Sequence, residues 1–277
     1  MLPENSYGDA KRWTFVDTVV RARRPRTVLD VGCGSGDLLT APLAVSYPEI
    51  EVVGVDADAV SLAHATARHG RANLRFLPFN ELPGDRRFDL VIASEVIEHV
   101  DAPDEFLCGL RSRVADGGAI ILTLPNGHGP AELGAMIEAL LRVSGAYRLL
   151  RAVWRALGLK RAAGMQEAPS LVSSLAVSPH VNFFGFRSIH SLLARAGFAV
   201  EIYRPRTFLC GFGFDHVIAL CRAIDWNARI ADRLPPALVS DWMFLAVPAR
   251  EAVAAGYRRG AWARFRAALN RRRWGLA

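Results

Sequence analysis

The chain has 277 residues, enough for one large or two small domains, and its 51% hydrophobic and 22% charged residues exclude a disordered or fibrous protein. Its four cysteines are scattered and form no Cys-x-x-Cys pair, which argues against a disulfide framework and favours a reducing compartment. The net charge is +7, and residues 250–277 alone carry eight arginines and one glutamate, so the basic excess lies mainly in a C-terminal tail.

The N-terminal segment has no features of a targeting signal. Residues 1–11 include Glu4, Asn5 and Asp9 and lack the apolar core of a signal peptide. No run of about 18 apolar residues is free of charge, so no membrane span is predicted. We therefore expect a cytoplasmic protein. Because the tail is basic, peripheral contact with the inner face of a membrane stays open as an alternative.

Short apolar runs alternate with helical periods over residues 26–126, a pattern typical of a parallel sheet with crossover helices. The predicted strands are 27–31, 52–55, 73–77, 88–93, 119–124, 198–203 and 242–247, and the predicted helices are 37–46, 59–69, 104–114 and 188–196. We expect one domain over residues 1–248, with inserts at about 127–180 and 204–241, and a basic tail over 249–277.

A glycine-rich turn follows the first predicted strand. It has the form Asp30-x-Gly32-x-Gly34-x-Gly36, which differs from the Gly-x-Gly-x-x-Gly of dinucleotide-binding folds. Glycine is needed where the backbone adopts a positive φ and a ligand touches the main chain. Asp56 ends the next strand, where a carboxylate can accept hydrogen bonds from both hydroxyls of a ribose.

The run from Val28 to Gly36, the triplet Gly54-Val55-Asp56 and the strand start Phe88-Asp89 together resemble the class I S-adenosylmethionine (SAM) dependent methyltransferases. The resemblance implies a Rossmann-like α/β fold with a seven-stranded, mostly parallel sheet, helices on both faces and a helical insert after the fifth strand. It also implies SAM as cofactor. The cofactor-binding residues that it implies are Asp30, Gly32, Cys33, Gly34 and Gly36 for the methionine part, Asp56 and Ala57 for the ribose, Asn80 for the adenine, and Ser94 and Glu95 facing the sulfonium.

Methyl transfer to a hydroxyl is helped by a base, and histidine is the side chain best matched to neutral pH. We take His99 and His180 as the candidate catalytic residues and assign no metal. The segment containing Glu95, Glu98 and His99 is similar to the Glu-x-x-Glu-His element of methyltransferases of ubiquinone biosynthesis and of small-RNA 3′ ends. In the latter group this element binds a divalent metal with a further histidine, a role that falls here to His180. A metal site, an unassisted histidine base and purely structural histidines all remain open.

The first insert contains two helical stretches that are separated at Ser144 and Gly145. In the first stretch, five apolar residues share one face, opposite Glu138 and Arg142: Leu133, Met136, Ile137, Leu140 and Leu141. The second stretch, 149–157, has an apolar stripe opposite arginines. Such a hairpin suits either an anionic membrane interface or a substrate lid packed on the protein's own core. The second insert, with Trp226, would supply an apolar wall to the acceptor pocket.

The tail allows three interpretations: a membrane-surface anchor, an RNA-binding segment with stacking aromatics, or a solvated basic terminus. The membrane interpretation is favoured because no recognised RNA-binding module is present, so nucleic acid is not an expected partner. The sequence therefore predicts a SAM-dependent methyltransferase acting, most simply at oxygen, on a small hydrophobic or lipid-linked acceptor at a membrane surface. The alternatives are an RNA ribose methyltransferase and a non-catalytic SAM-binding protein.

Overall fold

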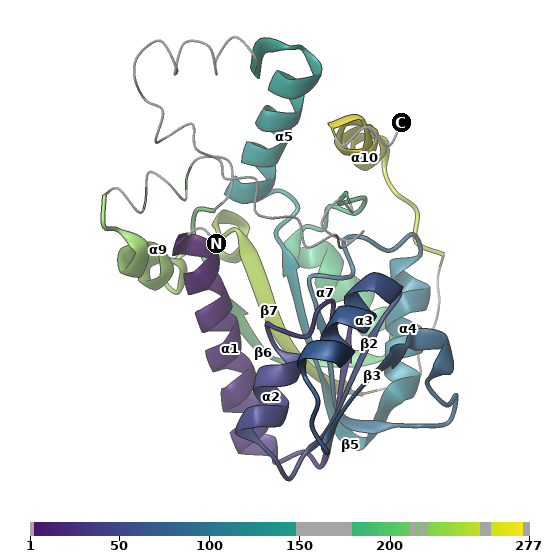
Figure 1. Ribbon diagram of the computed structural model, residues 1–277. Coiled ribbons are helices and arrows are strands. Elements are labelled where there is room, and N and C mark those ends of the chain that lie inside the picture. Colours follow the sequence, from purple (N-terminus) through teal and green to yellow (C-terminus); the bar gives the residue numbers. More distant parts are fainter. Residues whose placement is uncertain are drawn as a thin grey trace.

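A computed structural model describes residues 3–147, 179–210, 214, 218, 221–249 and 256–273 of the chain (Figure 1). The helices are α1 (Pro3–Arg23), α2 (Thr40–Ser46), α3 (Ala59–Arg68), α4 (Pro103–Arg113), α5 (Pro130–Val143), α7 (Phe186–Arg195), α9 (Ile224–Ala231) and α10 (Ala261–Arg273), with short 3₁₀ helices at Phe79–Glu81 and Pro236–Leu238. The strands are β1 (Thr27–Val31), β2 (Glu51–Asp56), β3 (Leu74–Pro78), β4 (Phe88–Ser94), β5 (Val114–Pro125), β6 (Phe198–Pro205) and β7 (Asp241–Pro248).

The strands form one seven-stranded sheet in the order β3-β2-β1-β4-β5-β7-β6. β1 pairs in parallel with β2 and β4, and these pair in parallel with β3 and β5. β7 is antiparallel to both β5 and β6. The predicted mostly parallel sheet is therefore confirmed. The strands after β1 are added on one side as far as β3, and from β4 onward on the other side, so the strand order reverses between β1 and β4, where open α/β sheets bind their ligands.

Apolar side chains cover both faces of the sheet. One core joins the sheet to α4 and α7, and its side chains include Leu107, Leu110 and Leu192. The other joins it to α1 and α2, with Val16 and Leu43 among its members. Because both faces are buried, the central strands read as continuous apolar runs and not as alternating ones.

Three features differ from the sequence expectations. α1 was not predicted, because among its described side chains the buried apolar ones begin only at Phe15. α2 begins at Thr40 and not at residue 37, since the glycine turn continues through Ser35 to Leu38. Glu95, Glu98 and His99 would share one face only if their segment were helical, and residues 95–100 form a turn instead. The second predicted helical stretch of the first insert, 149–157, lies outside the described residues.

Candidate active site

The glycine turn after β1 has the backbone that the sequence predicts. Gly32, Gly34 and Gly36 have φ angles of 74°, 55° and 73°, a region that favours glycine. A Cβ on Gly32 would lie 2.3 Å from Cγ2 of Val96, whereas a Cβ on Gly34 would meet no atom of the described residues within 4 Å. Gly32 is therefore required for packing, and Gly34 leaves open space beside the turn.

Two carboxylates lie beside this turn. Asp56 is buried; its Oδ2 accepts a hydrogen bond from the backbone N–H of Gly34 at 2.7 Å and its Oδ1 accepts one from Asp58 at 2.8 Å. Asp30 accepts a hydrogen bond from the hydroxyl of Thr40 at 2.6 Å, and burial raises the pKa of Asp30 to about 6. The structure thus brings Asp30 and Asp56 to the same edge as the glycines.

The other residues expected to bind the cofactor lie around this edge. Cys33 is half-buried within the turn, and Ala57 is exposed directly after β2. Asn80 is exposed in the 3₁₀ helix that follows β3. All three lie at or beyond the carboxyl ends of strands that belong to one half of the sheet.

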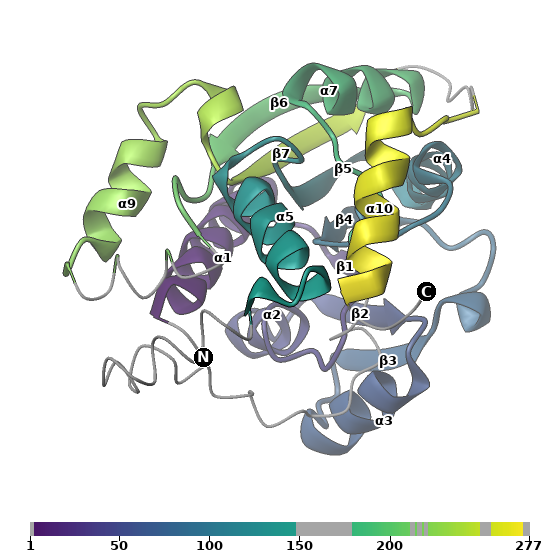
Figure 2. The ribbon, with the colours of Figure 1, turned by 90° about the horizontal axis from the view of Figure 1, so that it is seen from above.

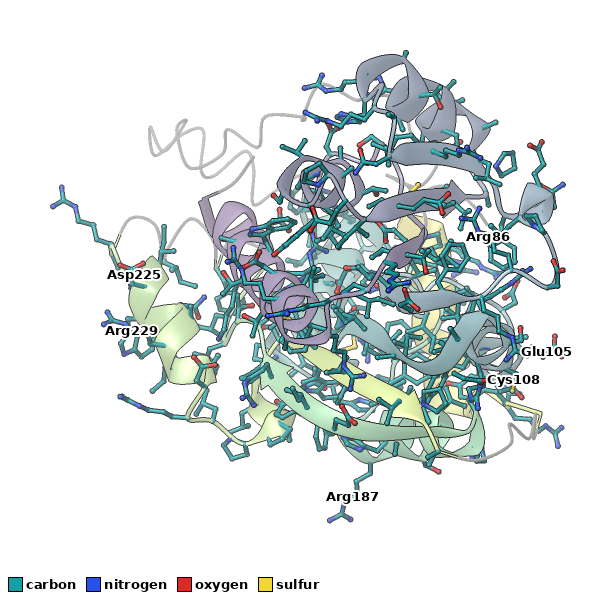
Figure 3. All side chains as sticks on the ribbon, turned by 90° about the horizontal axis from the view of Figure 1, so that it is seen from below. Arg86, Glu105, Cys108, Arg187, Asp225 and Arg229 are labelled. Carbon is teal, nitrogen blue, oxygen red and sulfur yellow. The ribbon has the colours of Figure 1, made fainter. Side chains whose placement is uncertain are left out.

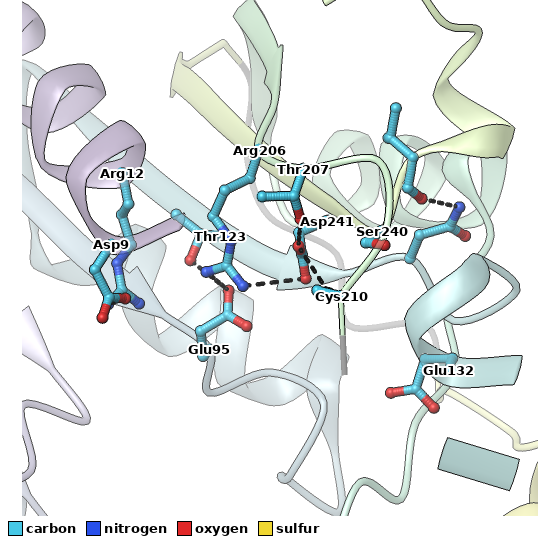
Figure 4. A network of polar contacts seen from close by, with 12 residues as sticks. Asp9, Arg12, Glu95, Thr123, Glu132, Arg206, Thr207, Cys210, Ser240 and Asp241 are labelled. Atoms are coloured by element: carbon cyan, nitrogen blue, oxygen red, sulfur yellow. Dashed lines mark hydrogen bonds and ion pairs between the residues drawn. The ribbon is translucent and has the colours of Figure 1, made fainter. Parts of the chain in front are cut away.

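A polar network continues from the end of β4 (Figure 4). Arg12 donates to the hydroxyl of Ser94 at 2.9 Å, Ser94 is hydrogen-bonded to Thr123 at 2.8 Å, and Thr123 donates to Oε1 of Glu95 at 2.8 Å. Glu95 has a φ of 58°, a left-handed conformation that is uncommon for a residue other than glycine and that surrounding contacts must hold in place.

Arg206 lies on the other side of Glu95. Its guanidinium is 3.4 Å from Oε1 of Glu95 and 3.1 Å from Oδ1 of Asp241, the first residue of β7. Burial acts to raise the pKa of Glu95, but the charges of Arg206 and Arg12 and the hydrogen bond from Thr123 outweigh it and lower that pKa. Glu95 is therefore held ionised.

Sequence reasoning did not identify Arg12, Arg206 or Asp241 as site residues. They come from α1, from the residue after β6 and from the start of β7, and no short motif joins them. The sequence offered one signal for two of them, namely their place in the chain: Arg206 directly follows β6, and Asp241 directly precedes the apolar run of β7.

Glu98, His99 and His180 form a second cluster. One ligand atom from each lies within 4.8 Å of the others, and the two histidine rings make an edge contact at 4.9 Å between centroids. The structure therefore brings together the two histidines selected from the sequence, which are 81 positions apart in the chain.

The two histidines have different surroundings. Nδ1 of His99 lies 3.3 Å from the carbonyl oxygen of Pro179 and so carries the proton, and burial lowers the pKa of His99. Burial also acts to lower the pKa of His180, but a hydrogen bond from Nδ1 to Glu132, and the charges of Glu132 and Glu98, outweigh it and raise the pKa to about 9.

The cluster has the chemistry of a divalent-cation site. Glu98 is buried, and within the described residues neither of its carboxylate oxygens has a hydrogen-bond partner. Burial and the nearby charge of Glu95 raise the pKa of Glu98 to about 8. A bound cation would satisfy both oxygens. Three of the four side chains that the family resemblance suggested as ligands come together, while Glu95 is engaged by Thr123 and Arg206.

The C-terminal segment lies over this cluster. Glu132 on α5 accepts from His180 with one carboxylate oxygen and from Arg266 on α10 with the other, at 2.8 Å. Arg266 is buried, with its guanidinium 3.7 Å from the ring centre of Phe183. Asn270 donates to the carbonyl oxygen of His180 at 3.2 Å. The interpretation of the tail as a solvated terminus therefore does not apply to Arg266.

The strand order, the turn at the end of β1 and the carboxylate at the end of β2 define the class I SAM-dependent methyltransferases. Residues 13–202 match the family described as "Methyltransferase domain", and the chain belongs to this family. The cofactor of the family is SAM, so the prediction of the family, the fold and the cofactor is confirmed.

Among curated proteins, the chain is 34% identical over 116 residues to the ubiquinone biosynthesis O-methyltransferase of Rickettsia bellii strain OSU 85-389, which is 40% of this chain and 47% of that protein. It is 34% identical over 134 residues to an uncharacterized protein of Synechococcus, 45% of this chain and 31% of that protein. The chain thus spans about half the length, or less, of these curated relatives.

A solved structure, the plantazolicin methyltransferase BpumL in complex with a triazolic desmethylPZN analog and SAH, matches 90% of this chain and 86% of that chain, with a TM-score of 0.50 and 14% identity. A SAM-dependent methyltransferase structure from Listeria monocytogenes matches 87% of this chain and 99% of that chain, with a TM-score of 0.51 and 11% identity. At this identity the likeness concerns the fold alone.

Proposed function

We propose that this protein transfers the methyl group of SAM to an oxygen atom of a hydrophobic or lipid-linked acceptor. The observation that carries the proposal is the contact between two histidines of opposite electrostatic character beside the end of β4. SAM supplies an electrophilic methyl group on a sulfonium, so the protein needs to align the acceptor, exclude water and move one proton.

The cofactor would occupy the carboxyl edge of the sheet. We assign Asp30, Gly32, Cys33, Gly34 and Gly36 to the methionine part, Asp56 and Ala57 to the ribose, Asn80 to the adenine, and Ser94 and Glu95 to the region of the sulfonium. The open space beside Gly34 and the positive φ angles of the turn support this assignment. The negative charge of Glu95 would complement the positive sulfonium.

We assign the role of general base to His99. Its Nδ1 proton points to the carbonyl of Pro179, so Nε2 carries the free lone pair, and its lowered pKa keeps the ring neutral near pH 7. Nε2 would take the proton from the acceptor hydroxyl as the new oxygen–carbon bond forms. His180, cationic at this pH, would donate from Nε2 to the same oxygen and stabilise its negative charge.

A divalent cation at Glu98, His99 and His180 is a second mechanism that the cluster fits. The two buried carboxylate oxygens of Glu98, which have no hydrogen-bond partner among the described residues, favour this mechanism. Such a cation would polarise the acceptor hydroxyl and lower its pKa.

The proposed acceptor class rests on the surroundings of the site. The helices over the cluster, α5 and α10, present apolar and basic side chains outward. Within the described residues, no helix is long and apolar enough to cross a bilayer. An acceptor carried by a lipid and reached from an anionic membrane surface suits both observations. We retain 1–248 as one methyltransferase domain with a basic tail over 249–277, of which residues 256–273 pack on the domain in this structure.

The proposal is tested with tritiated methyl-SAM and two acceptor fractions from bacterial cells, a lipid extract in vesicles and total RNA. We expect label in the lipid fraction, lost in His99→Gln and retained in His64→Gln, a control on α3. Label in RNA alone would favour ribose methylation. SAM binding measured by calorimetry, without transfer to either fraction, would favour a non-catalytic SAM-binding protein. The same assay with magnesium or with EDTA tests the cation.

A further inference from the structure

The outer side of α5 is apolar. Leu133, Ile137, Leu140 and Val143 are each about half exposed, at 47%, 49%, 46% and 48%. Their spacing puts them along one side of the helix, while Glu138 and Ala139 on the other side are buried. The expected grouping of apolar residues opposite Glu138 is present, but the apolar side faces outward and the glutamate faces the protein. The described residues therefore do not form a lid that packs on the protein's own core through this apolar side.

The outer side of α10 is aromatic and basic. Trp262 and Phe265 are 54% and 52% exposed, and their rings stack at 5.5 Å between centroids. Four arginines in and just before this helix are exposed as well: Arg258, Arg264, Arg271 and Arg272. The helix contains no acidic residue. Tryptophan and arginine side chains are the ones that favour the headgroup region of an anionic bilayer.

The two helices pack against each other over the end of the sheet that carries the candidate active site (Figure 2). We propose that the outer sides of α5 and α10 together form a binding surface for an anionic lipid bilayer. The proposal deepens and rests on the proposed function, since it names the partner on which the acceptor would be presented. The charge of the surface selects a bilayer with anionic headgroups.

The aliphatic row on α5 favours a bilayer over RNA. RNA would use the arginines and could stack on Trp262, but it offers no apolar phase to Leu133, Ile137 or Leu140. A bilayer interface accommodates both kinds of side chain at once, because the apolar groups enter the acyl boundary while the guanidinium groups stay at the phosphates.

The inner sides of the same two helices carry residues that contact the histidine cluster. Glu132 on α5 and Arg266 on α10 meet at 2.8 Å, and Glu132 is also bonded to His180. A bilayer bound to the outer sides would therefore lie across this pair of helices from the histidine cluster.

The test is co-sedimentation of the full chain with vesicles of equimolar phosphatidylcholine and phosphatidylglycerol, and with vesicles of phosphatidylcholine alone. These vesicles contain no methyl acceptor, so the result is independent of methylation. Trp262→Ser has a matched control in Trp226→Ser, which is 50% exposed on α9. Arg264→Gln with Arg271→Gln is compared with Arg187→Gln with Arg229→Gln, whose side chains project from α7 and α9 (Figure 3).

We expect binding to the anionic vesicles only, weakened by salt, and reduced about tenfold by Trp262→Ser. The double arginine variant is expected to lose affinity by roughly 25-fold, which is about fivefold for each arginine. The control variants should bind like the unchanged protein. Absence of binding, equal binding to both vesicles, or equal losses in test and control variants would overturn the proposal. Binding of RNA that competes with vesicles and weakens in the same variants would assign the surface to RNA instead.

Discussion

The ion pair between Arg266 and Glu132 gives the sharpest test of the way the C-terminal helix is attached. Both side chains are only 4% exposed, and their charged atoms lie 2.8 Å apart. Arg266 also donates to the carbonyl oxygen of Gly127 and lies over the ring of Phe183. Replacement of Arg266 by Met removes the positive charge and leaves the carboxylate of Glu132 buried, with His180 as its remaining charged partner.

Removing one member of a buried ion pair costs about 3–5 kcal/mol of unfolding free energy, because the remaining charge is poorly solvated. The contact with His180 keeps part of the stabilisation of Glu132, so we expect a loss near the lower end, about 3 kcal/mol. The double variant Arg266→Met with Glu132→Gln removes both charges and should recover about half or more of that loss.

The assay is urea unfolding followed by circular dichroism, with Arg21→Met as a control. Arg21 pairs with Asp17 on α1 at 2.8 Å, but its side chain is 71% exposed, so its loss should cost less than about 1 kcal/mol. If Arg266→Met costs no more than Arg21→Met, or if the double variant is less stable than Arg266→Met alone, the buried pair does not hold α10 in the way described.

Three further predictions concern the glycine turn, the buried carboxylate of Asp56 and the buried carboxylate of Glu98. Gly32→Ala should lower the free energy of unfolding by about 2–4 kcal/mol, because a clash with Val96 adds to the strain of a positive φ. Gly34→Ala has the strain of its positive φ but no clash, so it should cost only about 1–2 kcal/mol and should also weaken SAM binding in calorimetry; a larger loss of stability than in Gly32→Ala, with unchanged SAM affinity, would contradict the assignment of the open space at Gly34 to the cofactor. Asp56→Ala should weaken SAM binding at least about tenfold in calorimetry, since a charge-assisted hydrogen bond contributes about 1.5–3 kcal/mol, and unchanged affinity would remove Asp56 from the site. In the native state the pKa of Glu98 is raised from 4.5 to about 8, so between these pH values the native state keeps a proton that the unfolded state has released. The free energy of unfolding should therefore fall as the pH rises from about 4.5 to about 8. Glu98→Gln should flatten this part of the melting-temperature profile in buffer with EDTA, and parallel profiles for the two proteins would refute the shifted pKa.

The sequence determined the parts of this protein that depend on short stretches of chain. Apolar runs bounded by helical periods were enough to predict all seven strands, because a strand buried on both faces carries its signal locally. The turn from Asp30 to Gly36 was recognisable because its positive φ angles demand glycine at fixed spacings. These features also carried the family and the cofactor.

Other parts of the candidate site could not be read from the sequence. The family resemblance placed His99 and His180 in one site, but their opposite charge states depend on Pro179 and Glu132, which the sequence pattern did not predict as their neighbours. The left-handed backbone of Glu95 was likewise not predicted from the sequence.

Only the tertiary structure decided which charged residues face inward. Arg12 and Arg206 meet the end of β4 from positions 82 or more residues away, and Arg266 reaches Glu132 from 134 residues further along the chain. A basic tail and an amphipathic helix look the same in sequence whether their charges are solvated or buried, because burial depends on partners that no local period encodes. The orientation of α5 follows from such partners. Glu132 faces inward because its carboxylate pairs there with Arg266 and His180, and the apolar row faces outward, where no described element covers its leucines.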